Sequence, residues 1–222
     1  MREIRSFGRV RGRSLSQPQQ ELMNNNLVNW RLKDIEMGFN PIEIDNSKTA
    51  VWFEIGFGGA EHLIAQAMAN PNVQFIGAEP FTDGIVKALR AIEDNNIKNI
   101  RIIDNDARPV LNNLCDECLE RIFILFPDPW PKLRHHKRRL IDDAFVENLV
   151  RILKKNGQLR FASDWANYAE EALACFLRNP NLKWNANSQK DWQIPPNDHF
   201  TTRYQSKKLG DCEPQFFDFI RL

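Results

Sequence analysis

Long apolar runs and cysteine are both scarce in this 222-residue sequence. No stretch approaches the roughly 20 consecutive apolar residues that a membrane-spanning helix needs, and the first residues carry arginines where a secretory signal would have an apolar core. Four cysteines in a chain of this length, without such a signal, favour free thiols over a disulfide framework. We therefore expect a cytoplasmic protein with no membrane segment.

A large net charge of either sign is also absent. The chain has 30 Lys and Arg against 29 Asp and Glu, a formal net charge of +1, so its overall balance does not predict a nucleic-acid partner. The basic residues are nevertheless clustered. One cluster consists of Arg2, Arg5, Arg9, Arg11 and Arg13, and the other of Lys132, Arg134, His135, His136, Lys137, Arg138 and Arg139.

The pattern of the chain changes near Thr49. Residues 1–48 have scattered Pro, Gln, Asn and Arg, with a short helix predicted over residues 19–26, and we interpret them as a basic N-terminal arm. From Thr49 onwards, apolar runs of strand length alternate with segments of helical period, which is typical of βαβ units and a parallel sheet. We predict one α/β domain over residues 49–222, with a doubly wound, mostly parallel sheet.

The predicted strands are nearly continuous in apolar residues, as strands buried on both faces require. They cover residues 50–55, 73–78, 100–103, 121–126 and 158–162, and a last, antiparallel strand is predicted around residues 216–220. Helices are predicted over residues 61–69, 82–95, 108–114, 141–154 and 165–177. We expect Asn156 and Gly157 to end the fourth of these helices.

A glycine-rich turn follows the first predicted strand. Gly56, Gly58 and Gly59 lead directly into a helix, and such a turn lets the backbone approach a ligand closely. A dinucleotide-binding fingerprint would need a further glycine three positions after Gly58, where Glu61 stands. The sequence therefore disfavours an oxidoreductase.

Acidic residues occur at the ends of three neighbouring strands, namely Glu54, Glu79 and Asp106. In a doubly wound sheet these positions meet at the carboxyl edge, where ligands bind, and Glu79 can accept hydrogen bonds from both hydroxyls of a ribose. Any one of them alone is equally consistent with a solvated loop carboxylate. This pocket has no lysine and no phosphate-binding loop of the Walker type, which favours a nucleoside without phosphates, such as S-adenosylmethionine.

The fourth predicted strand ends in the segment FPDPW, residues 126–130, and the second basic cluster follows it. Two prolines hold Asp128 in a stiff loop, as a reacting centre requires, so Asp128 is the first candidate for chemistry. The alternative is a proline-rich turn with a solvated carboxylate. The basic cluster is a candidate for phosphate binding, and the alternative for it is a solvated helix start.

The sequence resembles the bacterial tRNA (guanine-N7)-methyltransferase family over most of its length. The resemblance is carried by EIGFG at residues 54–58, FPDPW, the basic cluster, SDW at residues 163–165 and TRY at residues 202–204. It implies a seven-stranded, Rossmann-like class I methyltransferase fold, S-adenosylmethionine as cofactor, and methyl transfer to N7 of the variable-loop guanine, position 46, of tRNA.

The resemblance also implies roles for individual residues. Asp128 is the implied catalytic residue. The implied cofactor-binding residues are Glu54, Gly56, Gly58, Glu79, Asp106 and Asp128. The implied substrate-binding residues are Lys132, Arg134, His135, His136, Lys137, Arg138, Arg139, Asp164, Thr202, Arg203, Tyr204 and Gln205.

The chain departs from the family pattern at two positions. Ala60 stands where the family often has glycine, and Gln205 stands where the family has glutamate. A carboxylate can accept hydrogen bonds from both N1–H and the amino group of guanine, whereas a glutamine amide offers one acceptor atom. The Gln205 side chain therefore accepts through one atom where the family glutamate accepts through two.

The chemistry of guanine agrees with this interpretation. N7 carries a lone pair and no proton, so it attacks a sulfonium methyl group without a general base, and a carboxylate such as Asp128 or Asp164 can stabilise the positive charge that develops. In double-stranded RNA, N7 lies in a groove too deep and narrow for side chains. The target guanine of the tRNA partner must therefore lie in a loop or be displaced.

Two alternatives remain at this point. One is an amino-group methyltransferase, although its usual motif places the polar residue before two prolines, whereas Asp128 lies between them. The other is an RNA-binding protein with an unused cofactor pocket. Cys115 and Cys118 have the spacing of half a zinc site, but no second half follows, so we expect no metal. His62 and His199 have no partner that suggests catalysis, and the sequence leaves open whether the protein is a monomer or a homodimer.

Overall fold

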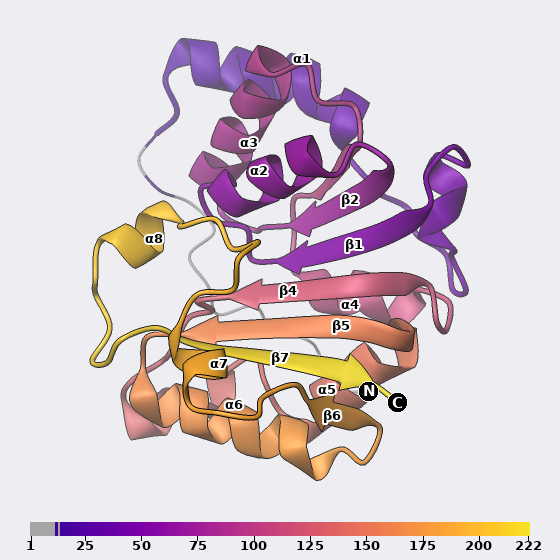
Figure 1. The fold of residues 1–222 in the computed structure, drawn as a ribbon. Coiled ribbons are helices and arrows are strands. Elements are labelled where there is room, and N and C mark those ends of the chain that lie inside the picture. The colour runs from indigo at the N-terminus through magenta and orange to yellow at the C-terminus, as the bar shows by residue number, and fades with distance from the viewer. Residues whose placement is uncertain (1–11, 13) are drawn as a thin grey trace. The chain divides into compact units, whose positions relative to one another are not determined.

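The computed structural model in Figure 1 describes residue 12 and residues 14–222. The N-terminal arginine cluster, which extends from Arg2 to Arg13, lies outside the described residues. Contacts along the chain divide it into two compact units, Met1–Cys115 and Asp116–Leu222. These contacts do not place a boundary between residues 48 and 49, and the predicted boundary there stays a prediction.

The first unit contains three parallel strands in the order β3-β2-β1. They are β1 (Ala50–Ile55), β2 (Val73–Ala78) and β3 (Ile100–Ile103), and all three coincide with predicted strands. The other elements are α1 (Gln17–Trp30), the 3-10 turn η1 (Pro41–Ile44), α2 (Glu61–Ala69), α3 (Thr82–Asp94) and α4 (Ala107–Asn113). Every residue of β2 is buried, as the continuous apolar pattern requires.

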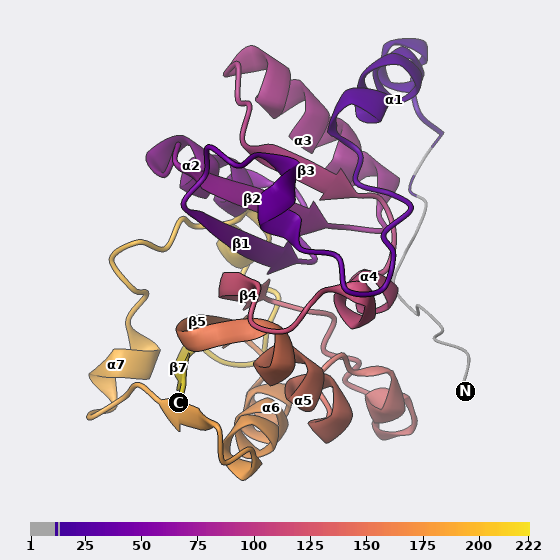
Figure 2. The same cartoon turned by 90° about the vertical axis from the view of Figure 1, so that its right-hand side faces the viewer.

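The core of the first unit is formed by apolar side chains that α2 and α3 place against the strands. In α3, Ile85, Leu89 and Ile92 recur at helical spacing and are almost fully buried. Helix α1 lies beside α3 and adds Leu27 to the same core (Figures 1 and 2). It is longer than predicted at both ends, and at its start Ser16 and Gln19 form a capping box.

The second unit contains four strands in the order β4-β5-β7-β6. Strands β4 (Leu119–Leu125) and β5 (Leu153–Ser163) are parallel, whereas β7 (Gln215–Arg221) runs antiparallel to both β5 and β6 (Leu182–Trp184). The helical elements are η2 (Leu133–Arg138), α5 (Asp143–Ile152), α6 (Ala166–Arg178), α7 (Lys190–Gln193) and α8 (Arg203–Ser206). Helices α5 and α6 pack on each other and on β5.

The predicted end of the fourth helix is wrong. Helix α5 ends at Ile152, and β5 begins at the next residue, so Asn156 and Gly157 lie within the strand. There the pairing of β4 with β5 shifts register between Leu119 and Arg121, and Asn156 has φ +63°. Residues 154–157 of β5 therefore stand opposite the single residue Glu120 of β4, and the Asn-Gly pair lies in this irregularity of the strand. A left-handed residue such as Asn156 is also common at a helix end, which is why the pattern is ambiguous.

The predicted fold class is confirmed. The described residues contain seven strands, mostly parallel, with helices alternating along the chain and antiparallel pairing at the C-terminal strand. The three-residue strand β6 was not predicted, because only Leu182 of its residues is buried and the apolar pattern is short. None of the helices in the described part of the chain is both long enough and apolar enough to cross a membrane.

We expect Gly84→Ala to destabilise the first unit. A Cβ at this position of α3 would lie 2.2 Å from the carbonyl oxygen of Gly58, in the glycine turn. Such overpacking should lower the free energy of unfolding by about 1–3 kcal/mol, whereas Gly-to-Ala inside a helix otherwise gains up to about 1 kcal/mol. Urea unfolding measures the change, with Lys87→Ala on the exposed side of α3 as control. An unchanged or more stable Gly84→Ala variant would contradict the close approach.

Candidate functional site

The glycine turn after β1 has the backbone conformation that only glycine adopts freely. Gly56 has φ +74° and Gly58 has φ +53°. Among the described residues, and apart from each glycine and its two neighbours in the chain, no heavy atom lies within 4 Å of the position that a Cβ would take at either glycine. The turn therefore borders open space into which a ligand can approach the backbone.

Ala60 takes the left-handed conformation as well. Its φ is +67°, and it directly precedes α2. This conformation costs an L-residue with a Cβ roughly 1–2 kcal/mol. The glycine that the family often has at this position would adopt it without strain, which gives the departure noted in the sequence a physical cost.

The Glu79 carboxylate is fixed against the glycine turn. Its Oε2 accepts a hydrogen bond from the Gly58 N–H at 2.8 Å, and its Oε1 accepts one from the Phe81 N–H at 2.9 Å. The residue is 7% exposed. Because each carboxylate oxygen has two lone pairs, Glu79 can accept further hydrogen bonds while it keeps this orientation.

Glu54 is held by a series of hydrogen bonds between buried side chains. Its Oε2 lies 2.8 Å from Nδ1 of His62, and Nε2 of His62 lies 3.3 Å from the amide nitrogen of Gln66. Asn70 donates to the amide oxygen of Gln66, which fixes the direction of that amide. The Gln66 nitrogen therefore donates to His62, and Nδ1 of His62 donates to Glu54. His62 therefore has hydrogen-bond partners that orient Glu54, and the absence of a partner that suggests catalysis stays a prediction.

The negative charge of Asp106 has different partners from those of Glu54 and Glu79. Its Oδ1 accepts from the backbone N–H of Arg108 and so caps α4, and its Oδ2 lies 2.6 Å from Nη2 of the same arginine. The strands bring these carboxylates to one edge, because Ile55 pairs with Ala78 and Ala78 with Ile103. The first unit thus gathers the predicted cofactor-binding residues Glu54, Gly56, Gly58, Glu79 and Asp106 at the carboxyl ends of its strands.

In the second unit, the loop after β4 carries Asp128 in a strained backbone. Phe126 and Trp130, which flank the Pro-Asp-Pro segment, have φ +53° and +45°. Left-handed conformations of bulky residues cost roughly 1–3 kcal/mol each and occur preferentially at functional sites. The Asp128 side chain is exposed, yet the protein atoms around the loop displace enough water to raise the pKa of its carboxyl.

Asp164 lies at the end of β5 and is only 4% exposed. Burial raises the pKa of its carboxyl, against the opposing effect of backbone hydrogen bonds and of Tyr204, whose hydroxyl donates to Oδ1 at 3.5 Å. Burial, followed by weaker effects that include the charges of Asp164 and Asp128, raises the pKa of Tyr204. The Tyr204 ring also packs against Phe126, at 5.7 Å between centroids. The second unit thus brings the Asp128 loop, Asp164 and Tyr204 together.

The segment that precedes α8 is fixed by short-range contacts. Thr202 Oγ1 accepts from the Gln205 N–H, and Oε1 of Gln205 lies 2.8 Å from Nε2 of His199. The His199 ring packs on Phe216, at 4.8 Å between centroids. His199 therefore has a partner, although not a catalytic one, and it determines how the Gln205 amide is oriented. Arg203 is exposed.

The basic cluster is not uniform. Lys132, Arg134 and Lys137 are exposed, whereas His135, His136 and Arg138 are half-buried and Arg139 is buried. Desolvation, together with the surrounding cations, lowers the pKa of His135. A uniform row of phosphate-binding side chains would not include a buried guanidinium, so the sequence interpretation does not hold equally for all seven residues.

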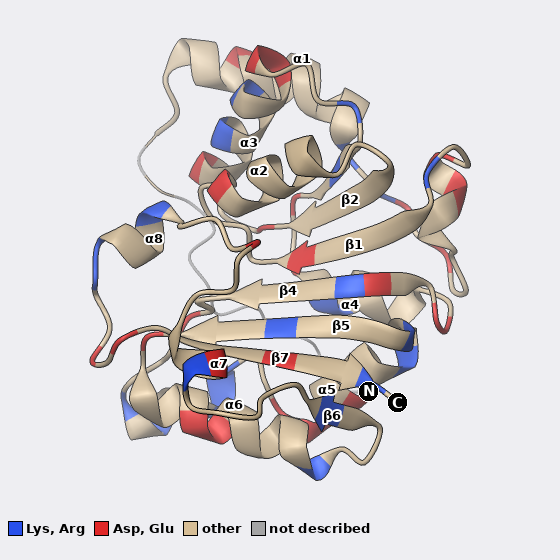
Figure 3. Ribbon diagram, viewed as in Figure 1, with Lys and Arg blue, Asp and Glu red and all other residues tan. Residues whose placement is uncertain are grey.

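An ion-pair network inside the second unit was not predicted. Arg160 of β5 pairs with Asp218 of β7 and with Asp198, and Arg121 of β4 pairs with Asp198 at 2.6 Å. Figure 3 shows charged segments within β4, β5 and β7. Burial raises the pKa of Asp198, but hydrogen bonds and charge from the two arginines outweigh it and lower the value to about 2. Asp198 thus ties the segment before His199 to the sheet.

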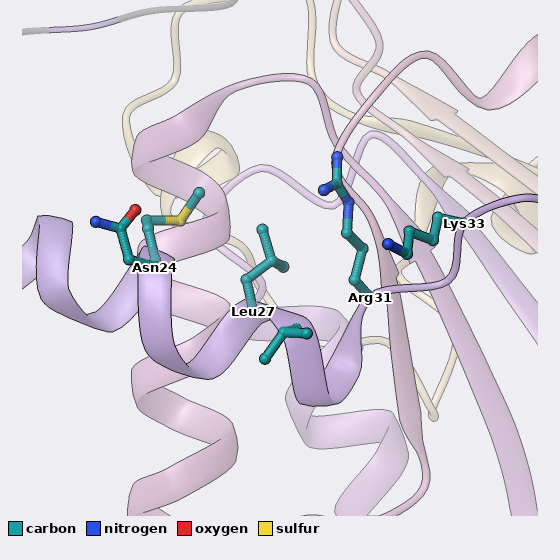
Figure 4. A pocket seen from close by; sticks show the side chains of 6 residues that line it. Asn24, Leu27, Arg31 and Lys33 are labelled. Carbon is teal, nitrogen blue, oxygen red and sulfur yellow. The ribbon is translucent and has the colours of Figure 1, made fainter.

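A shallow hollow beside α1 holds none of the predicted site residues. Figure 4 shows the side chains around it, which are Met23, Asn24, Leu27, Val28, Arg31 and Lys33. Within residues 12 and 14–222, no three His, Cys, Asp or Glu side chains are grouped as a metal site would require, and the four cysteines are free.

Comparisons with known proteins cover nearly the whole chain. A family model described as putative methyltransferase matches residues 48–212. The tRNA (guanine-N(7)-)-methyltransferase of Hyphomonas neptunium is 50% identical, over 97% of this chain and 99% of its own length. The protein of the same name from Caulobacter vibrioides is 47% identical, over 98% of this chain and 95% of its own.

Solved structures share the fold at low sequence identity. A putative methyltransferase from Streptococcus mutans in complex with SAH has a TM-score of 0.54 at 13% identity, over 84% of this chain and 100% of that one. The 16S rRNA methyltransferase KamB has a TM-score of 0.55 at 10% identity, over 81% and 91%. At these identities the likeness shows the fold alone.

We expect Asp198→Asn to destabilise the protein in a pH-dependent way. Since the folded-state pKa of Asp198 is lowered to about 2, its stabilisation is present above the ordinary Asp pKa and is lost as the pH falls through the folded value. The variant should therefore unfold at a lower temperature near neutral pH, and the difference should vanish towards pH 2. Asp116→Asn, at an exposed ion pair with Arg151, is the control. A deficit that does not depend on pH would rule out the ion pairs as its cause.

Proposed function

Because this chain belongs to the tRNA (guanine-N7)-methyltransferase family, we propose that it transfers the methyl group of S-adenosylmethionine to N7 of the variable-loop guanine of tRNA. The observation that carries the proposal is the near-full-length similarity to the curated relatives. The fixed carboxylates and the strained Asp128 loop support it. We expect the enzyme to act in the cytoplasm, where its tRNA substrate is.

The first unit fits S-adenosylmethionine. The glycine turn borders open space, and the neighbouring carboxylates offer acceptors for a nucleoside without phosphates. We assign the ribose hydroxyls to Glu79, whose orientation two backbone N–H groups already fix. Glu54, held by His62, and Asp106 are further cofactor-binding residues in this proposal, and Gly56 and Gly58 allow the close approach. When bound, the cofactor supplies an electrophilic methyl group on a sulfonium sulfur.

The reaction needs positioning and charge stabilisation rather than proton transfer. The N7 lone pair forms the new bond to the methyl carbon, the carbon–sulfur bond breaks with its electron pair going to sulfur, and the guanine ring becomes cationic. Asp164 is buried, and the protein atoms around the exposed Asp128 displace enough water to raise the pKa of its carboxyl, so a carboxylate at either position interacts more strongly with a developing positive charge than one in bulk water. Both must be ionised to act in this way.

The substrate-binding residues lie in the second unit. The exposed cations Lys132, Arg134 and Lys137 are available for phosphates beside the target guanine. Thr202, Tyr204 and Gln205 are ordered by Asp164, His199 and the cap of α8, so they can contact a base at a defined position. This arrangement suits a guanine in a loop, whose edges are accessible to side chains.

The activity is tested with methyl-labelled S-adenosylmethionine and unmodified tRNA. We expect label in 7-methylguanosine after digestion of the tRNA to nucleosides, and its loss when the variable-loop guanine is replaced. Label in another nucleoside would leave the methyltransferase activity standing and overturn the substrate. Cofactor binding without any transfer would instead favour an RNA-binding protein.

We expect Asp128→Asn to reduce turnover at saturating substrates on the order of 100-fold, because the stabilising carboxylate is lost. The same variant should be more stable than the wild type at neutral pH. Since desolvation raises the folded-state pKa of Asp128, the wild type loses stability as the pH rises through that pKa, whereas asparagine stays neutral. Thermal unfolding as a function of pH checks this, and the two proteins should converge at low pH.

The control for that experiment is Asp143→Asn. Asp143 is exposed, pairs with Arg178 and has no assigned role in the reaction, so turnover should be retained. Near-normal turnover in both Asp128→Asn and Asp164→Asn would refute the electrostatic role of the two carboxylates.

A further inference from the structure

The basic cluster that follows Asp128 contains one residue whose surroundings differ from those of the others. The side chain of Arg139 is 3% exposed, whereas Lys132, Arg134 and Lys137 reach solvent. A guanidinium at this depth cannot contact the phosphates of a bound RNA without leaving its partners. Its role must therefore be sought inside the second unit.

Arg139 contacts three parts of that unit at once, which are the Asp128 loop, η2 and α6. Its Nη2 lies 3.1 Å from Nε2 of His136 in η2. Its Nε donates to the carbonyl oxygen of Pro129 at 3.0 Å, in the loop that carries Asp128. Its Nη1 forms an ion pair with Glu171 of α6. The guanidinium lies over the ring of Tyr168, 4.9 Å from the centroid, and Tyr168 is fully buried. Arg139 thus connects the loop to a rigid helix.

The loop requires such a connection. Phe126 and Trp130 hold unfavourable backbone conformations at its two ends, and strain of this kind persists only where the surroundings determine the conformation. Pro129 directly follows Asp128, so a hydrogen bond to the Pro129 carbonyl fixes the Pro129–Trp130 peptide group, one residue beyond the carboxylate. Arg138 adds to the restraint, because its guanidinium lies 4.9 Å from the centroid of the Trp130 ring.

We propose that Arg139 is a positioning residue that fixes the Asp128 loop through the Pro129 carbonyl, while Lys132, Arg134 and Lys137 supply the phosphate contacts of the cluster. The proposal rests on the function proposed above, since it concerns the placement of the reacting carboxylate. The basic cluster, which is continuous in sequence, thus has a buried position at Arg139 and exposed positions at Lys132, Arg134 and Lys137.

Only arginine suits the inner position. Its planar fork donates in several fixed directions, so it satisfies Pro129 and Glu171 together, whereas a lysine ammonium is a single point charge on a flexible chain. Glu171 is 41% exposed, so loss of its partner leaves it able to reach water. Removing Arg139 should therefore loosen the loop without abolishing the fold.

The test compares Arg139→Gln with Arg134→Gln, the same chemical change at a buried and an exposed position of one segment. For each variant, turnover is measured at saturating tRNA and S-adenosylmethionine, and the tRNA Kd is measured as a function of salt. We expect Arg139→Gln to lower turnover at least about 10-fold, since small misplacements of a reacting group are costly, and to leave the salt dependence of Kd unchanged. Arg134→Gln should reduce the slope of log Kd against log salt by roughly 0.7–0.9.

Two further variants separate positioning from general destabilisation. Arg139→Lys should recover only part of the lost turnover, and Glu171→Gln should lower turnover with an unchanged salt slope, because it removes the partner that holds the guanidinium. Arg178→Gln, an exposed arginine on the same helix as Glu171, should retain full turnover. If Arg139→Gln does not fold at the assay temperature, Glu171→Gln decides the question alone.

The outcomes distinguish this proposal from the proposed function. A wild-type protein that forms no 7-methylguanosine refutes the function itself. An active wild type whose Arg139→Gln variant keeps its turnover but loses about one unit of salt slope refutes the positioning role and assigns Arg139 to phosphate binding. Reduced turnover with an unchanged slope supports the proposal.

Discussion

Each charged group that lies inside one of the two units must be compensated, because an unpaired charge away from water costs several kcal/mol. Glu54 meets this requirement through His62, and Glu79 through two backbone N–H groups. Arg160 meets it through two aspartates, and Arg139 through Glu171. In every case the hydrogen bond or ion pair that compensates the charge also fixes the orientation of the side chain. The partners that folding requires therefore also orient groups that the proposed reaction uses.

Backbone strain is concentrated beside those fixed charges. Ala60 lies next to the glycine turn, and Phe126 and Trp130 flank Asp128, all with φ in the left-handed region. Ring contacts of Phe126 with Tyr204 and Phe216 oppose the strain at one end of the Asp128 loop. The residues of the proposed site are therefore positioned by packing and ion pairs with surrounding residues. This explains why several of the surrounding residues are polar.

Local patterns predicted the strands β1, β2 and β3 to the residue, because burial on both faces leaves a continuous apolar run. The end of α5 was missed because Asn156 and Gly157 suit an irregularity within a strand as well as a helix end. The network around Asp198 joins residues far apart in the sequence, and only the presence of arginines within apolar strands could have indicated it. The burial of Arg139 could not be predicted, since its neighbours in the basic run are exposed and no periodicity separates them.

The position of β7 determines when the second unit can be completed during synthesis. This strand lies between β5 and β6 and is the only strand with which β6 pairs among the described residues. Its pairing with β5 joins residues about 60 positions apart, for example Gln158 and Ile220, and such non-local pairing is slow to form. Until the ribosome has released residues 215–221, the edge of β5 stays open. The growing chain is therefore exposed to wrong strand pairing at β5 until β7 is available to pair with it.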